Sequence, residues 1–141
     1  MVTEIVHRVG FEAPPRRVYR ALTVTDELAA WWTRDVTGSG DLGSVLVFGF
    51  PHRALAFRFF VQELSEPKLV RWRCLGGHPE WKDTEITFTL TEAEQRTTLD
   101  FEHRGWRSAS SIYRASFVDW AHSLASLQAY VDLGTGWPRP G

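Results

Sequence analysis

The sequence predicts an α+β fold in which one curved antiparallel sheet of about six strands wraps around a long C-terminal helix. Three observations predict it: a series of strand-like segments with short connections, two short helical segments after the first strand, and a long amphipathic segment near the end. Strands that follow one another and are closed by a helix are typical of this class. Because such a layout leaves a cavity between sheet and helix, we expect the function to lie there.

The first strand is predicted from the alternation of apolar and polar residues between Glu4 and Phe11. A period of two indicates a strand with one buried face. We expect that face to carry Ile5, His7, Val9 and Phe11. Pro14 and Pro15 then end the strand.

Two short helices are predicted next. Proline is tolerated in the first turn of a helix, so residues 16–22 can form a helix directly after Pro15. Thr25 is a good N-cap for the second helix, and the two acidic residues that follow it complement the helix dipole. The apolar stripe of this second helix consists of Leu28, Trp31 and Trp32.

The middle of the chain predicts the rest of the sheet. A loop is expected at Gly38 to Gly43, because it is rich in glycine. The strands are expected at residues 45–50, 55–64, 69–75, 86–91 and 97–103. Most of them alternate, so one face of each should be buried. The apolar run at 55–64 leaves the choice of its inward face open.

The last segment predicts a long amphipathic helix at residues 111–133. Its apolar residues are spaced by four and three in turn, which is one face of a helix. They are Tyr113, Phe117, Trp120, Leu124, Leu127 and Val131. Ser110 or Ser111 can cap its start, and Gly134 suits the left-handed residue after its end.

Short patterns along the whole chain resemble a known family. They are Phe11-x-Ala13-Pro14, residues 18–23, Trp31-Trp32, Glu63-Leu64-x-x-Pro67-x-x-Leu69, Thr97-x-Leu99 and His103-x-Gly105-Trp106. Together they resemble the START / birch-pollen-allergen (SRPBCC) superfamily, and most of all its AHSA-like branch. This branch is named after an activator of a heat-shock-chaperone ATPase. The resemblance implies a single domain over residues 1–141 with the helix-grip fold.

The resemblance implies three functions. The leading hypothesis is a non-enzymatic carrier or sensor that binds a small hydrophobic or aromatic molecule between the sheet and the C-terminal helix, with lipid binding and the stress response as related roles. The alternatives are an interaction protein that regulates a chaperone ATPase, and a cyclase- or hydrolase-type enzyme that uses the same pocket. A single domain argues against the chaperone role, since the resemblance assigns that activity to longer relatives.

Candidate ligand-binding residues are mostly aromatic, because aromatic side chains can form the wall of an apolar cavity. They are His7, Trp31, Trp32, Phe48, Phe57, Trp72, Cys74, Phe101, His103, Tyr113, Phe117 and Trp120. The two histidines fall on inward faces and could bind or protonate a polar group of the ligand. The alternative is a histidine that is hydrogen-bonded within the core. Cys74 is expected to be a neutral buried thiol, because a nucleophilic cysteine needs a base and an exposed electropositive setting.

Composition and motifs argue against several other classes. The net charge of −1 gives no field that attracts nucleic acid. Residues 38–43 fit G-x-G-x-x-G, but a strand follows them, whereas a dinucleotide site requires a helix there. No histidine pair has metal-ligand spacing, so neither a metal nor another cofactor is expected, and no catalytic residue is assigned.

The cellular setting is also predicted from composition. No stretch approaches the roughly 18 apolar residues of a membrane span, and the first residues do not resemble a signal peptide. The one cysteine cannot form an internal disulfide, which favours a reducing, cytoplasmic compartment. Lysine occurs only at Lys68 and Lys82 and asparagine is absent, which we interpret as bacterial coding bias. A homodimer is left open.

Overall fold

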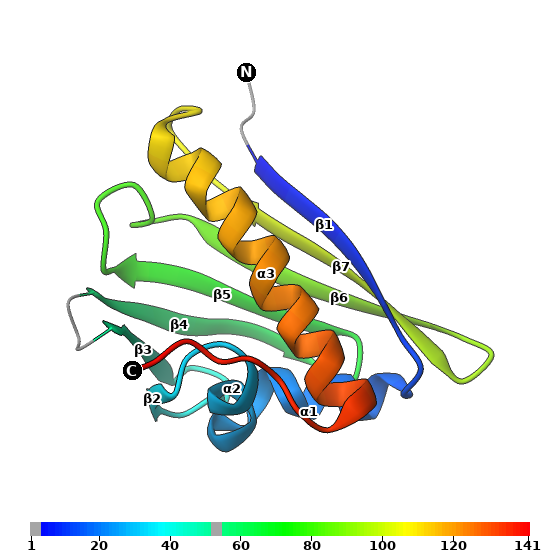
Figure 1. The fold of residues 1–141 in the computed structure, drawn as a ribbon. Helices are drawn as coiled ribbons and strands as arrows, with labels where there is room; N and C mark the ends of the chain where they lie inside the picture. The colour runs from blue at the N-terminus through cyan, green and yellow to red at the C-terminus, as the bar shows by residue number, and fades with distance from the viewer. Residues whose placement is uncertain (1–3, 52–54) are drawn as a thin grey trace.

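The computed structural model describes residues 4–51 and 55–141, and it has the predicted α+β architecture (Figure 1). One curved sheet lies behind the long helix α3, and the short helices α1 and α2 lie at one end of it. The elements in chain order are β1 (Glu4–Phe11), α1 (Pro15–Thr23), α2 (Thr25–Trp31), β2 (Asp35–Gly38), β3 (Val45–Phe50), β4 (Leu55–Ser65), β5 (Leu69–Gly76), β6 (Glu85–Ala93), β7 (Arg96–Arg104) and α3 (Ser111–Leu133).

Within the described residues, the strands form one seven-stranded antiparallel sheet in the order β1-β7-β6-β5-β4-β3-β2. The sequence predicted about six strands and missed β2. This strand has four residues, too few to show a period of two, and its pairing with β3 defines it. Strands β1 and β2 are therefore the two edges of the sheet.

The ends of α3 confirm the predicted caps. The Ser110 hydroxyl accepts a hydrogen bond from the Tyr113 N–H at 3.2 Å, and Gly134 takes the left-handed conformation with φ 87°. The start of α2 differs from the prediction. Val24 is its N-cap, and the Val24 carbonyl accepts from two backbone N–H groups, whereas Thr25 is already the first helical residue. Only one residue separates α1 from α2, so Thr25 has no room to stand outside the helix.

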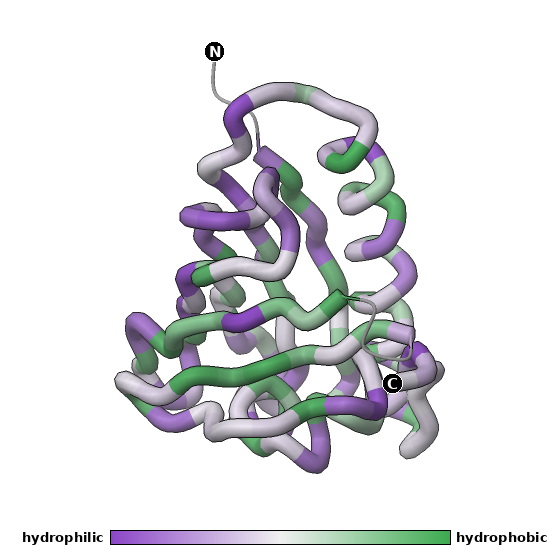
Figure 2. The backbone as a smooth tube through the Cα atoms, turned by 90° about the vertical axis from the view of Figure 1, so that its left-hand side faces the viewer, coloured by the Kyte–Doolittle hydropathy of each residue, from purple (hydrophilic) through white to green (hydrophobic). Residues whose placement is uncertain are grey.

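The core lies between the concave face of the sheet and α3. Figure 2 shows hydrophobic and hydrophilic segments in alternation along the strands. The inward faces of β5, β6 and β7 are those predicted, and their buried residues are Val70, Trp72, Cys74, Ile86, Phe88, Leu90, Leu99, Phe101 and His103. The sequence left the inward face of β4 open. In the structure this face carries Phe57, Phe59 and Val61, while Arg58 is exposed. Phe59 is fully buried but is not among the ligand-binding residues predicted from the sequence.

Candidate functional site

A cavity of about 250 Å³ lies at one end of the core. Five parts of the chain enclose it: the end of α2, the adjoining ends of β3 and β4, the connection between β5 and β6, the N-terminal half of α3, and the C-terminal tail. Its lining residues are Trp32, Phe50, Pro51, Leu55, Phe57, His78, Trp81, Ile112, Ala115, Ser116, Asp119, Trp120, Ser123 and Arg139.

Aromatic side chains form a closed ring of contacts around this cavity. Trp32 lies 5.7 Å from Phe50 between ring centroids, and Phe50 lies 5.6 Å from Phe57. Phe57 contacts Trp81 at 4.4 Å. Trp81 stacks on Trp120 at 6.1 Å, and Trp120 closes the ring on Trp32 at 4.8 Å. We call these five side chains the aromatic ring of the cavity; together they present a mostly apolar wall to any occupant.

Polar groups enter the cavity along one line of α3. Ser116, Asp119 and Ser123 are spaced by three and four, so they share one helix face. The Ser116 hydroxyl accepts a hydrogen bond from Trp81 Nε1 at 3.1 Å, which holds that indole in place. Ser116 and Ser123 are both buried, and their hydroxyl groups line the wall. Two hydroxyls on a mostly apolar wall can orient a polar substituent of a ligand.

The C-terminal tail forms the remaining wall. Figure 1 shows it returning from the end of α3 past α2. The Arg139 N–H donates to the Trp32 carbonyl at 2.8 Å, and the Arg139 carbonyl accepts from the Arg34 N–H at 3.0 Å. The Arg139 side chain then lies 3.3 Å from Asp119 of α3. The tail and the helix are thus joined by an ion pair among the cavity-lining residues.

His103 lies behind the aromatic ring and is fully buried. Trp120 Nε1 donates to His103 Nδ1 at 3.1 Å, and an indole N–H can only donate, so Nδ1 carries no proton. His103 Nε2 therefore carries the proton and donates to the Thr84 hydroxyl at 2.8 Å. Thr84 in turn donates to the Trp81 carbonyl at 2.5 Å. Burial lowers the pKa of His103 to about 3. Both ring nitrogens are engaged in the core, so His103 is a histidine that is hydrogen-bonded within the core.

Three of the predicted residues line the cavity: Trp32, Phe57 and Trp120. Others are packed behind it in the core, namely Trp31, Phe48, Trp72, Phe101 and Cys74. Burial raises the pKa of the Cys74 thiol to about 11, and the thiol donates to the Gly76 carbonyl, so it is a neutral buried group. A buried position on the inward face therefore did not suffice to identify a residue that lines the cavity.

His7, Tyr113 and Phe117 lie on the other side of α3, which corrects their expected place in the cavity. Phe117 is 44% exposed, and His7 Nε2 donates to its carbonyl at 3.1 Å. The Tyr113 hydroxyl donates to the Glu4 carbonyl of β1. The face of α3 that is turned toward the sheet carries Ser116, Trp120 and Ser123 instead.

Several lining residues were not predicted from the sequence. Trp81 lies in the connection between β5 and β6, and Arg139 belongs to a short tail rich in glycine and proline. Neither segment carries a periodic signal. Ser116 and Ser123 could have been found, since they share the helix face of Trp120. Within residues 4–51 and 55–141, no group of three metal-ligating side chains is present and no helix is long and apolar enough to cross a membrane.

Comparisons with known proteins agree with this architecture. The model of the family described as Activator of Hsp90 ATPase homolog 1-like protein matches residues 12–132. The structure is similar to that of the Aha1 dimer from Colwellia psychrerythraea, with 35% identity, 95% of this chain and 99% of that chain covered, and a TM-score of 0.86. Among curated proteins, none matches.

Two further similar structures have lower identity. A protein of Staphylococcus saprophyticus is 15% identical over 99% of this chain and 98% of that chain, with a TM-score of 0.79. CalU16 from Micromonospora echinospora is 18% identical over 92% of this chain and 74% of that chain, with a TM-score of 0.77. At these identities the similarity concerns the fold alone.

Proposed function

This chain belongs to the family of Activator of Hsp90 ATPase homolog 1-like proteins, and we propose that its cavity binds a small aromatic or hydrophobic molecule without chemical conversion. The observation that carries this proposal is the closed aromatic ring around a cavity of about 250 Å³. Ligand sites in proteins are mostly apolar and have a few placed polar groups. The serine hydroxyls and the ion pair of Asp119 with Arg139 supply those polar groups.

The volume limits the size of the ligand. A dry apolar cavity of about 150 Å³ holds benzene, and sites for drug-sized molecules begin near 300 Å³. The cavity lies between these values, which favours a ligand of one or two fused rings with one polar substituent. A long acyl chain or a large lipid exceeds this volume, so the lipid-binding role is the less supported form of the proposal.

A carrier or sensor role is favoured over catalysis. Catalysis of acyl or proton transfer needs a side chain that can take up and release a proton next to the substrate. His103 has both nitrogens engaged in the core and lies behind the aromatic ring. His78 and Asp119 border the cavity, but neither is paired with a nucleophile in the way a triad requires. Turnover of a bound aromatic molecule would contradict this part of the proposal.

Binding can be tested with 2-naphthol as the probe, followed by proton–nitrogen NMR of the indole N–H groups. We expect the Trp81 and Trp120 signals to shift on titration. Ala115 is exposed and lines the cavity, so Ala115→Phe should fill the entrance without disturbing the core. Ala121 is an exposed alanine of the same helix on the other side, and Ala121→Phe is the matched control.

The site is supported if the Trp81 and Trp120 signals no longer shift in Ala115→Phe but still shift in Ala121→Phe. Equal binding by both variants, or no binding of 2-naphthol at millimolar concentration, would contradict it. Native mass spectrometry of freshly purified protein then identifies a natural occupant. A stoichiometric apolar adduct would give the ligand class directly.

The family description supports a competing function, the regulation of a chaperone ATPase. Its test is the ATPase rate of a heat-shock chaperone with and without this protein. A stimulated rate that is unchanged in Ala115→Phe would favour the interaction role over the cavity.

The relative from Colwellia psychrerythraea, which was solved as a dimer, supports a proposal about assembly. We propose that this chain also forms a homodimer, because the two chains share 35% identity over nearly their full lengths. Sedimentation equilibrium of the wild-type protein measures this directly.

A further inference from the structure

The free edge of β1 carries backbone groups that point away from the sheet. The Glu4 carbonyl accepts from the Tyr113 hydroxyl at 2.8 Å, and the Gly10 carbonyl accepts from Gln128 Nε2 at 2.6 Å. Both bonds come from α3 rather than from β7, the strand that pairs with β1. The even-numbered residues of β1 therefore direct their peptide groups to the free edge, since the direction alternates along a strand.

The middle of this edge is not covered in the same way. Val6 and Arg8 have the same parity as Glu4 and Gly10, so their peptide groups also lie on the free edge. No side chain in the described part of the chain bonds to them. An edge of this kind can pair with another strand, and native proteins commonly block it. Here α3 bonds to one carbonyl at each end, which leaves that carbonyl a second lone pair, and it leaves the centre open.

Exposed apolar side chains lie beside the open segment. Val6 is 53% exposed on the outer face of β1. Phe117 of α3 is 44% exposed and packs on His7, which lies on the inner face of the same strand. When a strand edge accepts a further strand, side chains beside the edge contact the partner, and Val6 and Phe117 are placed to do so.

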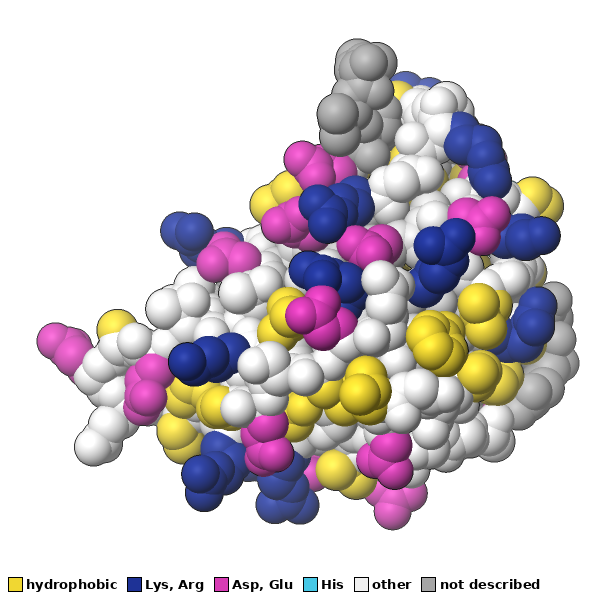
Figure 3. Space-filling view, turned by 180° about the vertical axis from the view of Figure 1, so that it is seen from behind, with side chains coloured by type: hydrophobic (Ala, Val, Ile, Leu, Met, Phe, Trp, Pro, Cys, Tyr) yellow, Lys and Arg dark blue, Asp and Glu magenta, His cyan; other side chains and the backbone are white. Residues whose placement is uncertain are grey.

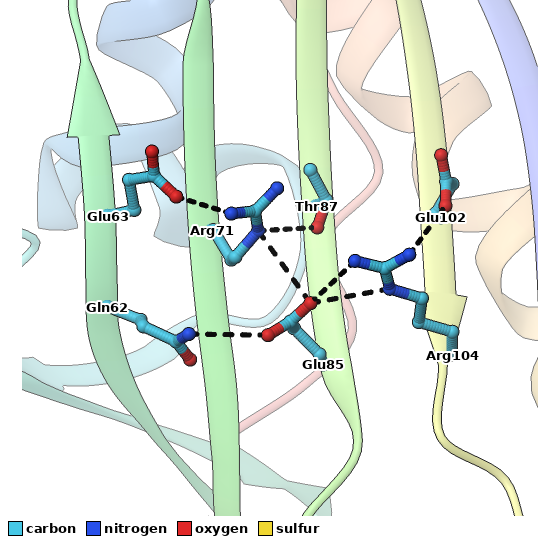
Figure 4. A network of polar contacts seen from close by, with 7 residues as sticks. All are labelled: Gln62, Glu63, Arg71, Glu85, Thr87, Glu102 and Arg104. Atoms are coloured by element: carbon cyan, nitrogen blue, oxygen red, sulfur yellow. Dashed lines mark hydrogen bonds and ion pairs between the residues drawn. The ribbon is translucent and has the colours of Figure 1, made fainter.

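On the outer face of the sheet, in contrast, acidic and basic side chains already form ion pairs with one another. Figure 3 shows this face with basic and acidic side chains interspersed. Figure 4 shows a network centred on Glu85, whose residues belong to β4, β5, β6 and β7. Arg104 donates to Glu85 at 3.1 Å, and Arg71 bonds to Glu63 and Thr87. Because these groups already have partners within the chain, the open edge is the better candidate for an interface.

The sequence of the open segment is complementary to itself. If a second copy of β1 lies antiparallel with Val6 opposite Val6, Glu4 of each copy lies opposite Arg8 of the other. These side chains share the outer face, so two cross-strand ion pairs flank one apolar pair. The Arg8 side chain is 74% exposed and bonds to Asp100 through Nε at 2.7 Å, which leaves its other nitrogens to a partner.

We propose that two copies of this chain associate through the free edges of β1, antiparallel and centred on Val6. This inference rests on the homodimer proposed above. The two-fold axis is perpendicular to the sheet, so both α3 helices lie on the same face and the contact is isologous. The two sheets then form one continuous sheet, and Phe117 of each copy faces the junction.

Charge reversal tests the surface and the register together. Glu4→Arg places arginine opposite Arg8 in the homodimer, and Arg8→Glu places glutamate opposite Glu4. Each single variant should dimerise at least about tenfold more weakly than wild type, because two attractive pairs become repulsive. In an equimolar mixture of the two variants every pair is again opposite in charge, so we expect the heterodimer to form. Native mass spectrometry separates it from both homodimers by mass.

The control is Glu92→Arg, the same charge reversal at an exposed position of β6 away from the edge. It should dimerise as wild type does. A wild-type protein that stays monomeric would overturn the homodimer and with it this inference. A wild-type dimer whose single variants and mixture behave like the control would overturn the β1 surface alone. Weak homodimers of both variants together with a strong heterodimer would establish it.

Discussion

Protonation of His103 should destabilise the fold in a defined pH range. The side chain is fully buried, and burial lowers its pKa to about 3, against an ordinary value of 6.5. The unfolded chain therefore binds a proton between pH 6.5 and pH 3 that the folded chain does not bind. Stability rises with pH wherever the unfolded state binds more protons, so it must fall as the pH is lowered through this range.

The magnitude follows from the two pKa values. Once the pH is below 6.5, each pH unit costs about 1.4 kcal/mol of unfolding free energy. Between pH 7 and pH 5 the loss due to this histidine is about 2 kcal/mol, because the first half unit contributes little. The structural reason is that a proton on Nδ1 would face the Trp120 indole N–H, which cannot accept it.

The assay is urea unfolding of wild type and His103→Gln at pH 7, 6 and 5, followed by circular dichroism. The variant will be less stable at every pH, but its free energy of unfolding should fall by about 2 kcal/mol less than that of wild type over this range. His122→Gln, the same substitution at an exposed position on α3, is the matched control. Equal pH dependence in wild type and His103→Gln would refute the assignment of His103 as a buried neutral group.

Three further predictions concern buried polar groups. Thr84→Val removes the acceptor of the His103 Nε2 proton and should cost about 1–3 kcal/mol in urea unfolding, while the exposed Thr91→Val should stay within about 0.5 kcal/mol of wild type; equal stabilities would contradict the hydrogen bond. Cys74 should resist iodoacetamide at pH 8 in the native protein and react fully in urea, because burial raises its thiol pKa to about 11; rapid native labelling, read by mass spectrometry, would show an accessible thiolate. Ser126→Ala removes the hydroxyl that joins α3, α2 and the tail, so we expect a loss of about 1–2 kcal/mol and faster amide exchange in the tail; unchanged exchange would mean that the tail is held by other contacts.

Local patterns predicted most of the fold because they act within one element. The alternation in β6 and β7 correctly gave Phe88 and Phe101 as inward residues. The cap of α3 at Ser110 and its end at Gly134 follow from backbone groups that each helix end must satisfy. Strand β2 was missed because four residues carry too little pattern, and only the pairing with β3 makes them a strand.

The cavity depended on contacts that no local pattern encodes. Periodicity tells which face of an element is buried, and so it grouped Trp72 and Trp120 as equivalent. In the structure Trp72 is enclosed by other rings, whereas Trp120 borders open space together with Trp81. That difference arises where five distant parts of the chain meet and their side chains leave a volume unfilled. The sequence by itself determined the layers and their inward faces. Only the tertiary structure decided where the core leaves a cavity, because packing depends on the sizes and positions of all neighbours together.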